Sequence, residues 1–468
     1  LEIAVRRRSL PSTEFIGSGP VLVRHLPRGA SYAAAHGVLA FGAYDAAAET
    51  TRLMVSTMDG VGYGVPQPIA DTEGLGLVRL ARIGGGRLLL AWEERPGVHG
   101  NPEARSVLRA AFFDGADWGA PHTAVSLAGY LTAMQIFVTD GRVSLVYLES
   151  PENRDSASAR IRAAAYDFGA ETWLRPQHIR SLATMPDAAL ACAGAGSDEP
   201  GRVVYVQSNH SVSSRYWDGV RSSVPGGAGY AYITGEDTDR IGLCPAGTND
   251  VLYLVLAGAD GDIRLRRYTP DPSRDPLDPD YDWNGRPAAV MWPELGRIHD
   301  DAGGAETLAC GWLADTNRLL TAWTRGGMLS CAFTDPSTMH DEGVHAITRN
   351  SAGCYSDLRI VPGTNAAAHI VARFRGAGTH ELRAFEVAPE HGAVAEDSDG
   401  DGHADHLELI LVDADPDDEI RCVQDVLGND DFDSDGVLNV EEWGAGTRAE
   451  WAGSYPDTGV RVLCGTSR

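Results

Sequence analysis

The chain has 468 residues, of which 43% are hydrophobic, so it is long enough for several domains or for one large repetitive domain. The formal net charge is −26, and all 39 basic residues are arginine. Because the chain is acidic and its only basic run is Arg6 to Arg8, we do not expect it to bind nucleic acids or anionic membranes. No run of 18 or more apolar residues predicts a membrane span, and the absence of lysine excludes phosphate-loop and Schiff-base chemistry.

Seven strand-like segments of similar pattern recur along the first 390 residues. Each is followed, after a gap, by a second strand-like segment, and Asp59, Asp114, Asp167 and Asp218 close four of these second segments at spacings of 55, 53 and 51 residues. The seven first segments are VLAFGAY (38–44), RLLLAWEE (87–94), RVSLVYLE (142–149), RVVYVQS (202–208), VLYLVLAG (251–258), RLLTAWTR (318–325) and HIVARFRG (369–376). A period of this length fits one four-stranded unit.

Further segments supply the other two strands of most units, for example LVRLARI before the strand at 87–94 and PHTAVSL after the turn at Asp114. Four short strands repeated seven times predict an all-β fold, a seven-bladed β-propeller over residues 34–390, because each blade buries its faces against its neighbours. The seventh unit lacks an outer strand, and PVLVRHL (20–26), in the N-terminal segment 1–33, is expected to supply it. A β-helix or an open sandwich array is the alternative.

Two predicted blade tips, FFDGADWGAP and YWDGVRSSVP, resemble the Asp-Gly hairpins of fucose-binding lectin propellers and, more loosely, the aspartate boxes of sialidase-like propellers. The resemblance covers these short hairpins only. In a sialidase box a Ser or Thr stands two residues before the Asp and a Trp five after it, whereas here Phe112 precedes Asp114 and Trp118 follows by four. We expect Trp118 and Tyr63 to pack between blades, with sugar stacking as the alternative.

The sialidase resemblance implies a glycoside hydrolase with its site at the mouth of the channel. Such an enzyme needs convergent arginines and carboxylates, and retaining catalysis needs two carboxyl groups about 5–5.5 Å apart. The spacing of the candidates is not diagnostic, so enzymatic activity stays open, with a non-catalytic function preferred. The candidates are Glu93, Glu94, Glu149, Arg79 and Arg82.

Seven cysteines occur, and three of them, Cys192, Cys244 and Cys310, fall at equivalent positions of predicted innermost strands. Three thiols around a channel suggest a metal site, but small buried core residues are the commoner use of such cysteines. We expect adjacent blades to hold them too far apart for a disulfide. Cys422 and Cys464 either form a disulfide in the C-terminal region or remain free thiols.

Two acidic loops near the C-terminus, DSDGDGHADHLE (397–408) and DFDSDGVLNVEE (431–442), share one pattern at a spacing of 34 residues. Between Glu396 and Glu442 there are 18 acidic residues and a single arginine, Arg421. Carboxylates this dense repel one another unless a cation lies among them. Ca²⁺ takes six to eight oxygen ligands, and alternate residues of a curled loop can provide them, with a glycine at the bend.

The loops resemble EF-hand loops and the calcium repeats of dockerins and of thrombospondin type 3 domains. A small α-helical calcium-binding module over residues 391–468 is therefore predicted, with two Ca²⁺ ions. An acidic cluster at Asp278, Asp280 and Asp282 could hold a third cation, although a solvated loop is preferred. The expected ligands of the two ions are Asp397, Asp399, Asp401, the carbonyl of His403, Asp405 (through water) and Glu408 in the first loop, and Asp431, Asp433, Asp435, the carbonyl of Val437, Asn439 and Glu442 in the second.

The preferred interpretation is an exported calcium-binding propeller that acts as a non-catalytic binding or assembly module. Calcium loops of this type work where calcium is millimolar, so an extracellular or cell-surface location is expected. The expected partner is a protein or a glycan at the cell surface, within an extracellular assembly in one version. Fold alone does not decide this, since propellers carry out both binding and catalysis.

Overall fold

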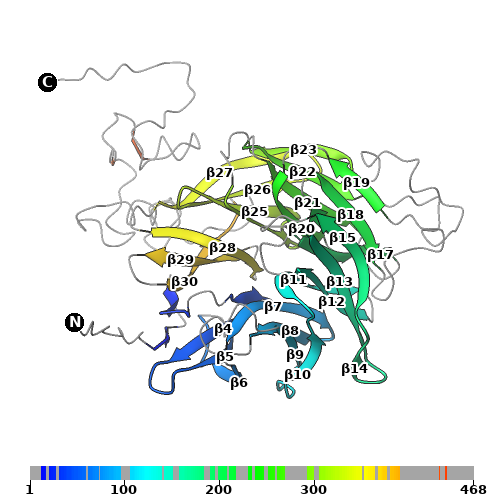
Figure 1. Ribbon diagram of the computed structural model, residues 1–468. Helices are drawn as coiled ribbons and strands as arrows, with labels where there is room; N and C mark the ends of the chain where they lie inside the picture. The colour runs from blue at the N-terminus through cyan, green and yellow to red at the C-terminus, as the bar shows by residue number, and fades with distance from the viewer. Residues whose placement is uncertain are drawn as a thin grey trace, which may run out of the picture.

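Seven antiparallel sheets follow one another around a ring in the computed structural model (Figure 1). The fold is all-β, and the seven-bladed propeller expected from the repeats is confirmed. The structure describes residues 12–389, with gaps at 17–20, 28–30, 59–61, 73, 96–105, 140–141, 151–157, 184–189, 196–198, 208–209, 218–229, 235–237, 247–250, 259–260, 269–291, 300–304, 350–352, 364–366 and 377–379, together with residues 432, 438 and 439.

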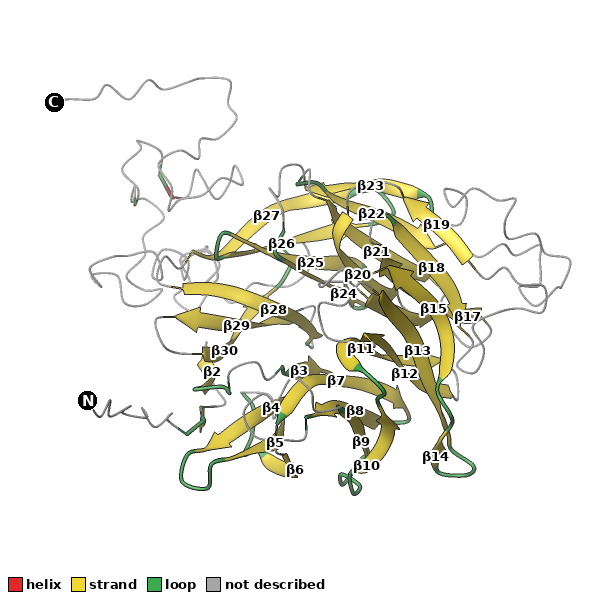
Figure 2. Ribbon diagram, viewed as in Figure 1, coloured by secondary structure: helices red, strands yellow, loops and turns green. Residues whose placement is uncertain are grey.

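Blades 1 to 3 each begin with an inner strand and proceed outward along the chain (Figure 2). In blade 3 the third strand pairs with both β14 and β15, so its outer edge is split. The strands are β3 (Ala33–Ala35), β4 (Val38–Asp45), β5 (Thr50–Thr57) and β6 (Gln67–Thr72) in blade 1; β7 (Leu75–Gly84), β8 (Arg87–Glu94), β9 (Val107–Phe113) and β10 (His122–Ser126) in blade 2; and β11 (Tyr130–Thr139), β12 (Arg142–Ser150), β13 (Ser158–Asp167), β14 (Thr172–Trp173) and β15 (Gln177–Ala183) in blade 3.

Blades 4 to 6 repeat the same order of four strands, each paired to the one before it. They comprise β16 (Leu190–Ala195), β17 (Glu199–Val206), β18 (Val212–Trp217) and β19 (Tyr230–Thr234) in blade 4; β20 (Thr238–Ala246), β21 (Val251–Gly258), β22 (Ile263–Tyr268) and β23 (Glu294–His299) in blade 5; and β24 (Thr307–Leu313), β25 (Arg318–Arg325), β26 (Met328–Asp335) and β27 (His340–Arg349) in blade 6.

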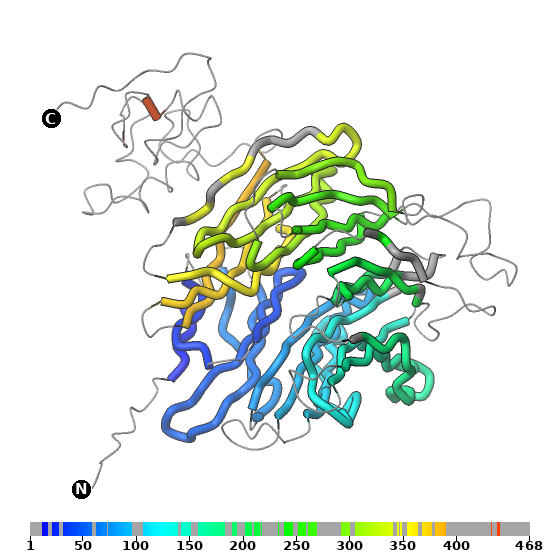
Figure 3. The backbone as a smooth tube through the Cα atoms, turned by 45° about the horizontal axis from the view of Figure 1, so that its top comes forward, coloured from blue at the N-terminus to red at the C-terminus, as the bar shows by residue number. Residues whose placement is uncertain are grey.

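Blade 7 combines strands from the two ends of the propeller, which lie side by side (Figure 3). Its first three strands are β28 (Gly353–Pro362), β29 (Ala368–Gly376) and β30 (His380–Val387). The outer edge is then completed by β2 (Val21–Arg24) and β1 (Glu14–Phe15). The N-terminal residues thus close the ring and cover the outer edge of β30, with the short strand β1 outermost.

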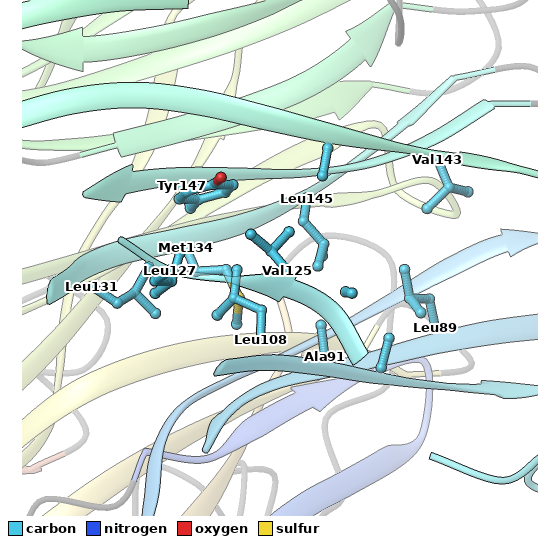
Figure 4. Packing of buried hydrophobic residues seen from close by; sticks show 13 residues of the cluster. Leu89, Ala91, Leu108, Val125, Leu127, Leu131, Met134, Val143, Leu145 and Tyr147 are labelled. Atoms are coloured by element: carbon cyan, nitrogen blue, oxygen red, sulfur yellow. The ribbon is translucent and has the colours of Figure 1, made fainter. Parts of the chain in front are cut away.

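The hydrophobic core is divided into seven clusters, one between each pair of neighbouring blades. Alternate residues of a strand face opposite sides of its sheet, so each inner blade strand contributes to two clusters. In β12, for example, Leu145 and Tyr147 pack toward blade 2, while Val146 and Leu148 pack toward blade 4. Figure 4 shows the cluster between blades 2 and 3, where Leu89 of β8 and Val143 of β12 lie on facing strands.

Two aspartates of the repeat, Asp114 and Asp167, close tight turns through their side chains, and the other two, Asp59 and Asp218, lie outside the described residues. The Oδ1 atom of Asp114 accepts hydrogen bonds from the backbone amides of Ala116 and Asp117, at 2.8 and 2.9 Å. This local contact explains the recurring Asp-Gly signal. Two aromatic residues near these turns pack as expected: Tyr63 is buried between blades 7 and 1, and Trp118 packs against Phe113 with ring centroids 5.3 Å apart.

The predicted α-helical calcium-binding module at 391–468 lies outside the described residues except at positions 432, 438 and 439. It therefore stays a prediction. Within the described part of the chain, no helix is long and apolar enough to cross a membrane.

Candidate functional site

Four charged side chains come together at the inner strands of blades 2 and 7. Arg79 belongs to β7, Asp357 and Arg359 belong to β28, and Arg373 belongs to the neighbouring strand β29. Cys192, on the inner strand of blade 4, is close enough to Arg79 for the two side chains to interact electrostatically. Since blades 2, 4 and 7 are not consecutive, the Arg79 guanidinium lies in the interior of the ring. We call Arg79, Arg359 and Arg373 the arginine cluster.

A break in the pairing of β28 with β29 shapes this site. The register shifts between Ser356 and Arg359, and Asp357 adopts a positive φ of 56°, which is strained for a residue with a β-carbon. The fully buried Tyr32 supports this bulge from blade 1. Its hydroxyl group lies within hydrogen-bonding distance of the carbonyl oxygen of Asp357 and 2.7 Å from that of Val371.

Asp357 is the carboxylate that balances the arginine cluster. Its Oδ1 atom lies 2.8 Å from Nη2 of Arg359, and its Oδ2 atom lies 3.8 Å from Nη2 of Arg373. Burial alone would raise the pKa of Asp357, but Arg359, Arg373 and Arg79 together hold it below its ordinary value. Asp357 is therefore ionised at neutral pH.

Arg79 is the least compensated member of the cluster. Its Nη1 atom donates to the carbonyl oxygen of Val78 at 2.8 Å, while its buried Nε atom has no acceptor among the residues that the structure describes. Burial, with the positive charge of Arg359, lowers the pKa of Arg79 to about 9. The side chain remains charged at neutral pH, so three guanidinium groups surround one carboxylate within a protein of net charge −26.

Glu93, a candidate catalytic acid, holds the end of its own blade together. It is fully buried, and its Oε2 atom accepts hydrogen bonds from Arg95 at 2.7 Å and from the backbone amide of Leu77 at 3.2 Å. Its Oε1 atom accepts a third, from the hydroxyl group of Ser106 at 2.7 Å. Both oxygen atoms are therefore engaged in contacts that position β7 and the start of β9.

Glu149 has a similar role in blade 3. Its Oε1 atom accepts from the backbone amides of Ala128 and Gly129, at 2.7 and 2.8 Å, and its Oε2 atom lies 3.1 Å from Nη1 of Arg162. The carboxylate thereby fixes the connection between blades 2 and 3. Its side chain is 4% exposed, which leaves little of it accessible to a substrate.

The remaining two candidates lie apart from the arginine cluster. Glu94 pairs with Arg109 at 2.7 Å. Arg82 is exposed at the far end of β7, where its charge and the burial of His36 lower the pKa of that histidine. Of the five residues suggested by sequence, the structure thus places only Arg79 in the cluster.

Sequence reasoning missed Tyr32, Asp357, Arg359 and Arg373. A signal was present in the segment SDLRIVPG, because two charged residues flank Leu358 in a strand predicted to line the channel. Charge is costly in such a strand unless it is paired or used. The sequence could not show that Tyr32 and Arg79, from two other blades, lie beside Asp357 and Arg359 in the folded ring.

The predicted calcium ligands are largely outside the described residues; the exception is Asn439, at the ninth position of the second loop. Asn439 is buried, and its Oδ1 atom accepts a hydrogen bond from the backbone amide of Phe432 at 3.1 Å. The ninth position thus turns back toward the second, as in a loop that curls around its centre, and the oxygen-rich residues fit Ca²⁺ chemically. Asp397, Asp399, Asp401, His403, Asp405, Glu408, Asp431, Asp433, Asp435, Val437 and Glu442 lie outside, as do Asp278, Asp280 and Asp282.

The three inner-strand cysteines are free thiols. Within the described ranges, no group of three or more His, Cys, Asp or Glu side chains is arranged to hold a metal ion. The expectation that adjacent blades hold these cysteines too far apart for a disulfide stays a prediction; Cys244 and Cys310 both belong to the core between blades 5 and 6. Their strands β20 and β24 are neighbours at the channel.

No family model matches the chain, and no curated protein matches it. Solved structures of similar shape include a prolyl endopeptidase, at 13% identity and a TM-score of 0.42, covering 77% of this chain and 50% of that one. The chain thus spans half the length of that enzyme.

Two other similar structures belong to proteins of different kinds. The NanB sialidase from Streptococcus pneumoniae is 9% identical, with a TM-score of 0.45, and the match covers 75% of this chain and 83% of that one. The WD40 domain of Toxoplasma gondii coronin is 8% identical, with a TM-score of 0.47, covering 82% and 88%. At these values no function follows, so the function must be argued from the site itself.

Proposed function

We propose that the protein is an exported, calcium-stabilised β-propeller that binds an anionic ligand at the arginine cluster. The observation that supports this most strongly is the state of Arg79. A buried Nε donor that finds no acceptor among the described residues is costly, and the positive charge of the neighbouring Arg359 adds to that cost. A bound anion would accept this donor and offset the excess positive charge of the cluster.

The chemistry of the cluster favours a ligand that carries a carboxylate or sulfate group. Guanidinium groups donate in a planar fork that matches such oxyanions, and hydrogen bonds between charged partners are about twice as strong as neutral ones. Asp357 already occupies part of the fork of Arg359, so the ligand is expected to engage chiefly Arg79. An acidic glycan of the cell surface would carry such a group, in keeping with a binding role.

Calorimetric titration of the complete chain with glucuronic acid, N-acetylneuraminic acid and sodium sulfate tests this proposal. We expect at least one of these probes to bind, and Arg79→Gln to weaken its binding about tenfold or more. Arg82→Gln is the matched control, because Arg82 lies on the same strand but is exposed outside the cluster. Equal affinities for the two variants, or no heat with any probe, would contradict the proposal.

A glycoside hydrolase is the second candidate, and the geometry favours it less. Glu93 and Glu149 have both of their carboxylate oxygen atoms engaged by hydrogen bonds that position the strands. Tyr32 is also poorly suited to act as a nucleophile. Burial raises its pKa, which disfavours the phenolate, and its hydroxyl group donates to a backbone carbonyl oxygen. An assay on aryl sialosides separates the two functions: hydrolysis that Glu93→Gln or Glu149→Gln abolishes, with folding retained, would favour the enzyme.

The C-terminal loops are proposed to hold two Ca²⁺ ions that keep their segment folded. In an unliganded loop, neighbouring carboxylates repel, so binding of the ion and ordering of the loop are coupled. The contact of Asn439 with Phe432 supports a curled second loop. Calcium reaches the concentration that such sites need outside cells, and we therefore propose that the protein is exported. Its proposed partner is accordingly a protein or a glycan at the cell surface.

A further inference from the structure

Basic side chains gather at the outer edge of blade 3, where β13 pairs with β15 (Figure 2). The register of the two strands sets Arg162 opposite His178 and Arg160 opposite Ser181. The hydroxyl oxygen of Ser181 lies 3.3 Å from Nε2 of His178. Arg160, His178 and Ser181 are all exposed, so this edge is open to a ligand from solution.

The strand geometry keeps these charges out of the core. Arg160 and Arg162 flank Ile161, which is buried between blades 3 and 4, so both arginines lie on the opposite face of β13. Arg180 follows on β15, and Arg215 lies on β18 of blade 4; both are half-buried. We define the basic edge as Arg160, Arg162, His178, Arg180 and Arg215.

The basic edge has a positive local potential. Burial lowers the pKa of His178, and the charges of all four arginines of the basic edge lower it further. Glu149 pairs with Arg162 at 3.1 Å and stands opposite Arg160 in the strand register, so the edge contains one carboxylate close to two of its arginines. The four arginines still act together on His178 in the presence of that carboxylate.

The net charge of the protein does not prevent an anion from binding here. Of the total of −26, −17 arises from residues 396–442, and all other residues together carry −9. At physiological salt, interactions between exposed charges are largely screened beyond about 8 Å. The arginines close to a bound anion therefore decide its affinity for the basic edge.

We propose that the basic edge binds an extended acidic polysaccharide. Guanidinium groups match sulfate and carboxylate groups in shape and charge. Positions 160 and 162 are spaced by about 7 Å along β13, and His178 lies on the next strand, so successive acidic groups of one chain can reach different members of the edge. The arginine cluster in the interior of the ring shares no residue with this edge, so the inference does not depend on anion binding there.

A polysaccharide fits this edge better than an acidic protein does. Protein interfaces need a central apolar area in addition to a polar rim. Among the residues that the structure describes, the exposed large hydrophobic side chains are Ile16, Val65 and Leu174, none of which belongs to β13 or β15. Contacts with the basic edge are therefore chiefly ionic and should weaken as salt is added.

Calorimetric titration of the complete chain with a heparin oligosaccharide at low salt tests the proposal. We expect Arg160→Gln and Arg180→Gln each to weaken binding about threefold, and the double variant about tenfold, because each change removes one ionic contact. Arg325→Gln is the matched control, since it removes the same charge from an exposed position of blade 6. If the double variant does not fold, Arg160→Gln decides, because Arg160 is exposed.

Arg79→Gln distinguishes this surface from the arginine cluster. Heparin should still bind to Arg79→Gln, whether or not the small anions bind at the cluster. Loss of heparin binding in Arg79→Gln, with none in the double variant, would overturn the inference and leave the cluster as the site. Polyglutamate that binds as tightly as heparin would overturn the assignment to a polysaccharide. Equal heparin affinities of the wild type and the double variant would leave these charges only the role of preventing strand pairing at a sheet edge.

Discussion

The hydroxyl group of Tyr32, which precedes the first strand of blade 1, donates a hydrogen bond to the carbonyl oxygen of Val371 in blade 7, at 2.7 Å. The contact joins residues 339 positions apart and lies beside the bulge that presents Asp357 to the arginines. Closure of the ring and the geometry of the candidate site therefore depend on the same side chain.

Tyr32→Phe removes this donor and leaves buried carbonyl oxygens without it. We expect a loss of about 1–3 kcal/mol in the free energy of unfolding, measured by urea denaturation. Anion binding should weaken as well, since the bulge loses its support. Tyr44→Phe, at a half-buried tyrosine near the end of β4, is the control. An unchanged stability of Tyr32→Phe would show that the hydrogen bond has no net effect.

Asp357→Asn removes the carboxylate within the arginine cluster. Because a competing negative charge is lost, we expect anions to bind more tightly to this variant, opposite to the effect of Arg79→Gln. Without an anion the variant should be less stable by about 2 kcal/mol, and sulfate should restore part of the loss. Calorimetry and thermal melting with and without sulfate measure both effects.

The same carboxylate predicts an acid response. The pKa of Asp357 is lower in the folded chain than its ordinary value of 3.8, so its stabilising contribution is complete above that pH and is lost as the pH falls through the lowered value. Asp357→Asn should therefore show a smaller loss of stability on acidification below pH 4 than the wild type. Identical acid unfolding curves would contradict this.

His122 links blade 2 to the extended hairpin of blade 3. Its Nε2 atom accepts a hydrogen bond from Nε1 of Trp173 at 2.8 Å, which requires a neutral ring. Burial lowers the pKa of His122 from 6.5, so the unfolded chain binds a proton first and the stability falls as the pH drops from 7 through the lowered value. The melting temperature and tryptophan emission between pH 7.5 and 5 should report this change. The change in tryptophan emission should be absent from His122→Gln, and the fall in melting temperature should be smaller there than in the wild type, because His36, whose pKa is also lowered, still contributes; both changes should be retained in full in His369→Gln.

Val23 tests the closing strand. It is fully buried in β2, where it pairs with Leu382, whereas the adjacent Arg24 is largely exposed. Val23→Ala should cost about 2 kcal/mol in unfolding free energy. Arg24→Ala removes two long ion pairs, of 3.7 Å to Glu14 and 4.0 Å to Glu381, and should cost less than about 1 kcal/mol. Similar effects of the two changes would argue that β2 contributes little to the stability of the ring.

Calcium binding is tested by stoichiometry. Calorimetry of the chelated protein should show two Ca²⁺ ions, and Glu408→Gln and Glu442→Gln should each reduce the number by one, because each removes the bidentate ligand of one loop. Asp425→Asn, which lies between the loops, should leave the number at two. A chelated protein that shows neither heat on calcium addition nor a change in melting temperature would contradict the proposed sites.

The architecture was predictable because its signal is local and repeated. The first segments, such as RLLLAWEE and RVSLVYLE, became the second strands of successive blades, with burial over nearly their full length. Aspartates such as Asp114 marked the turns through hydrogen bonds to residues two and three positions later. Repetition supplied the number of blades, which no single segment could have indicated.

The candidate site was not predictable in the same way, because its residues come from blades distant in the sequence. Glu93 and Arg79 were equally plausible as functional residues until the structure showed that one is buried by local hydrogen bonds and the other lies in the interior of the ring. Likewise, the strand positions of Cys244 and Cys310 were correct, but the close approach of Cys310 to Gly242 is a steric feature that the strand pattern does not indicate.

The pairing of β2 with β30 also constrains how the nascent chain folds. At 5–20 residues per second, a ribosome needs roughly 20–70 s to make the residues between these strands. During that interval β2 has β1 beside it but lacks β30, and the earlier blades form a ring that is still open. Because the ring cannot close before β30 has been made, this protein would depend on chaperones to protect the open ring during synthesis, whatever its ligand.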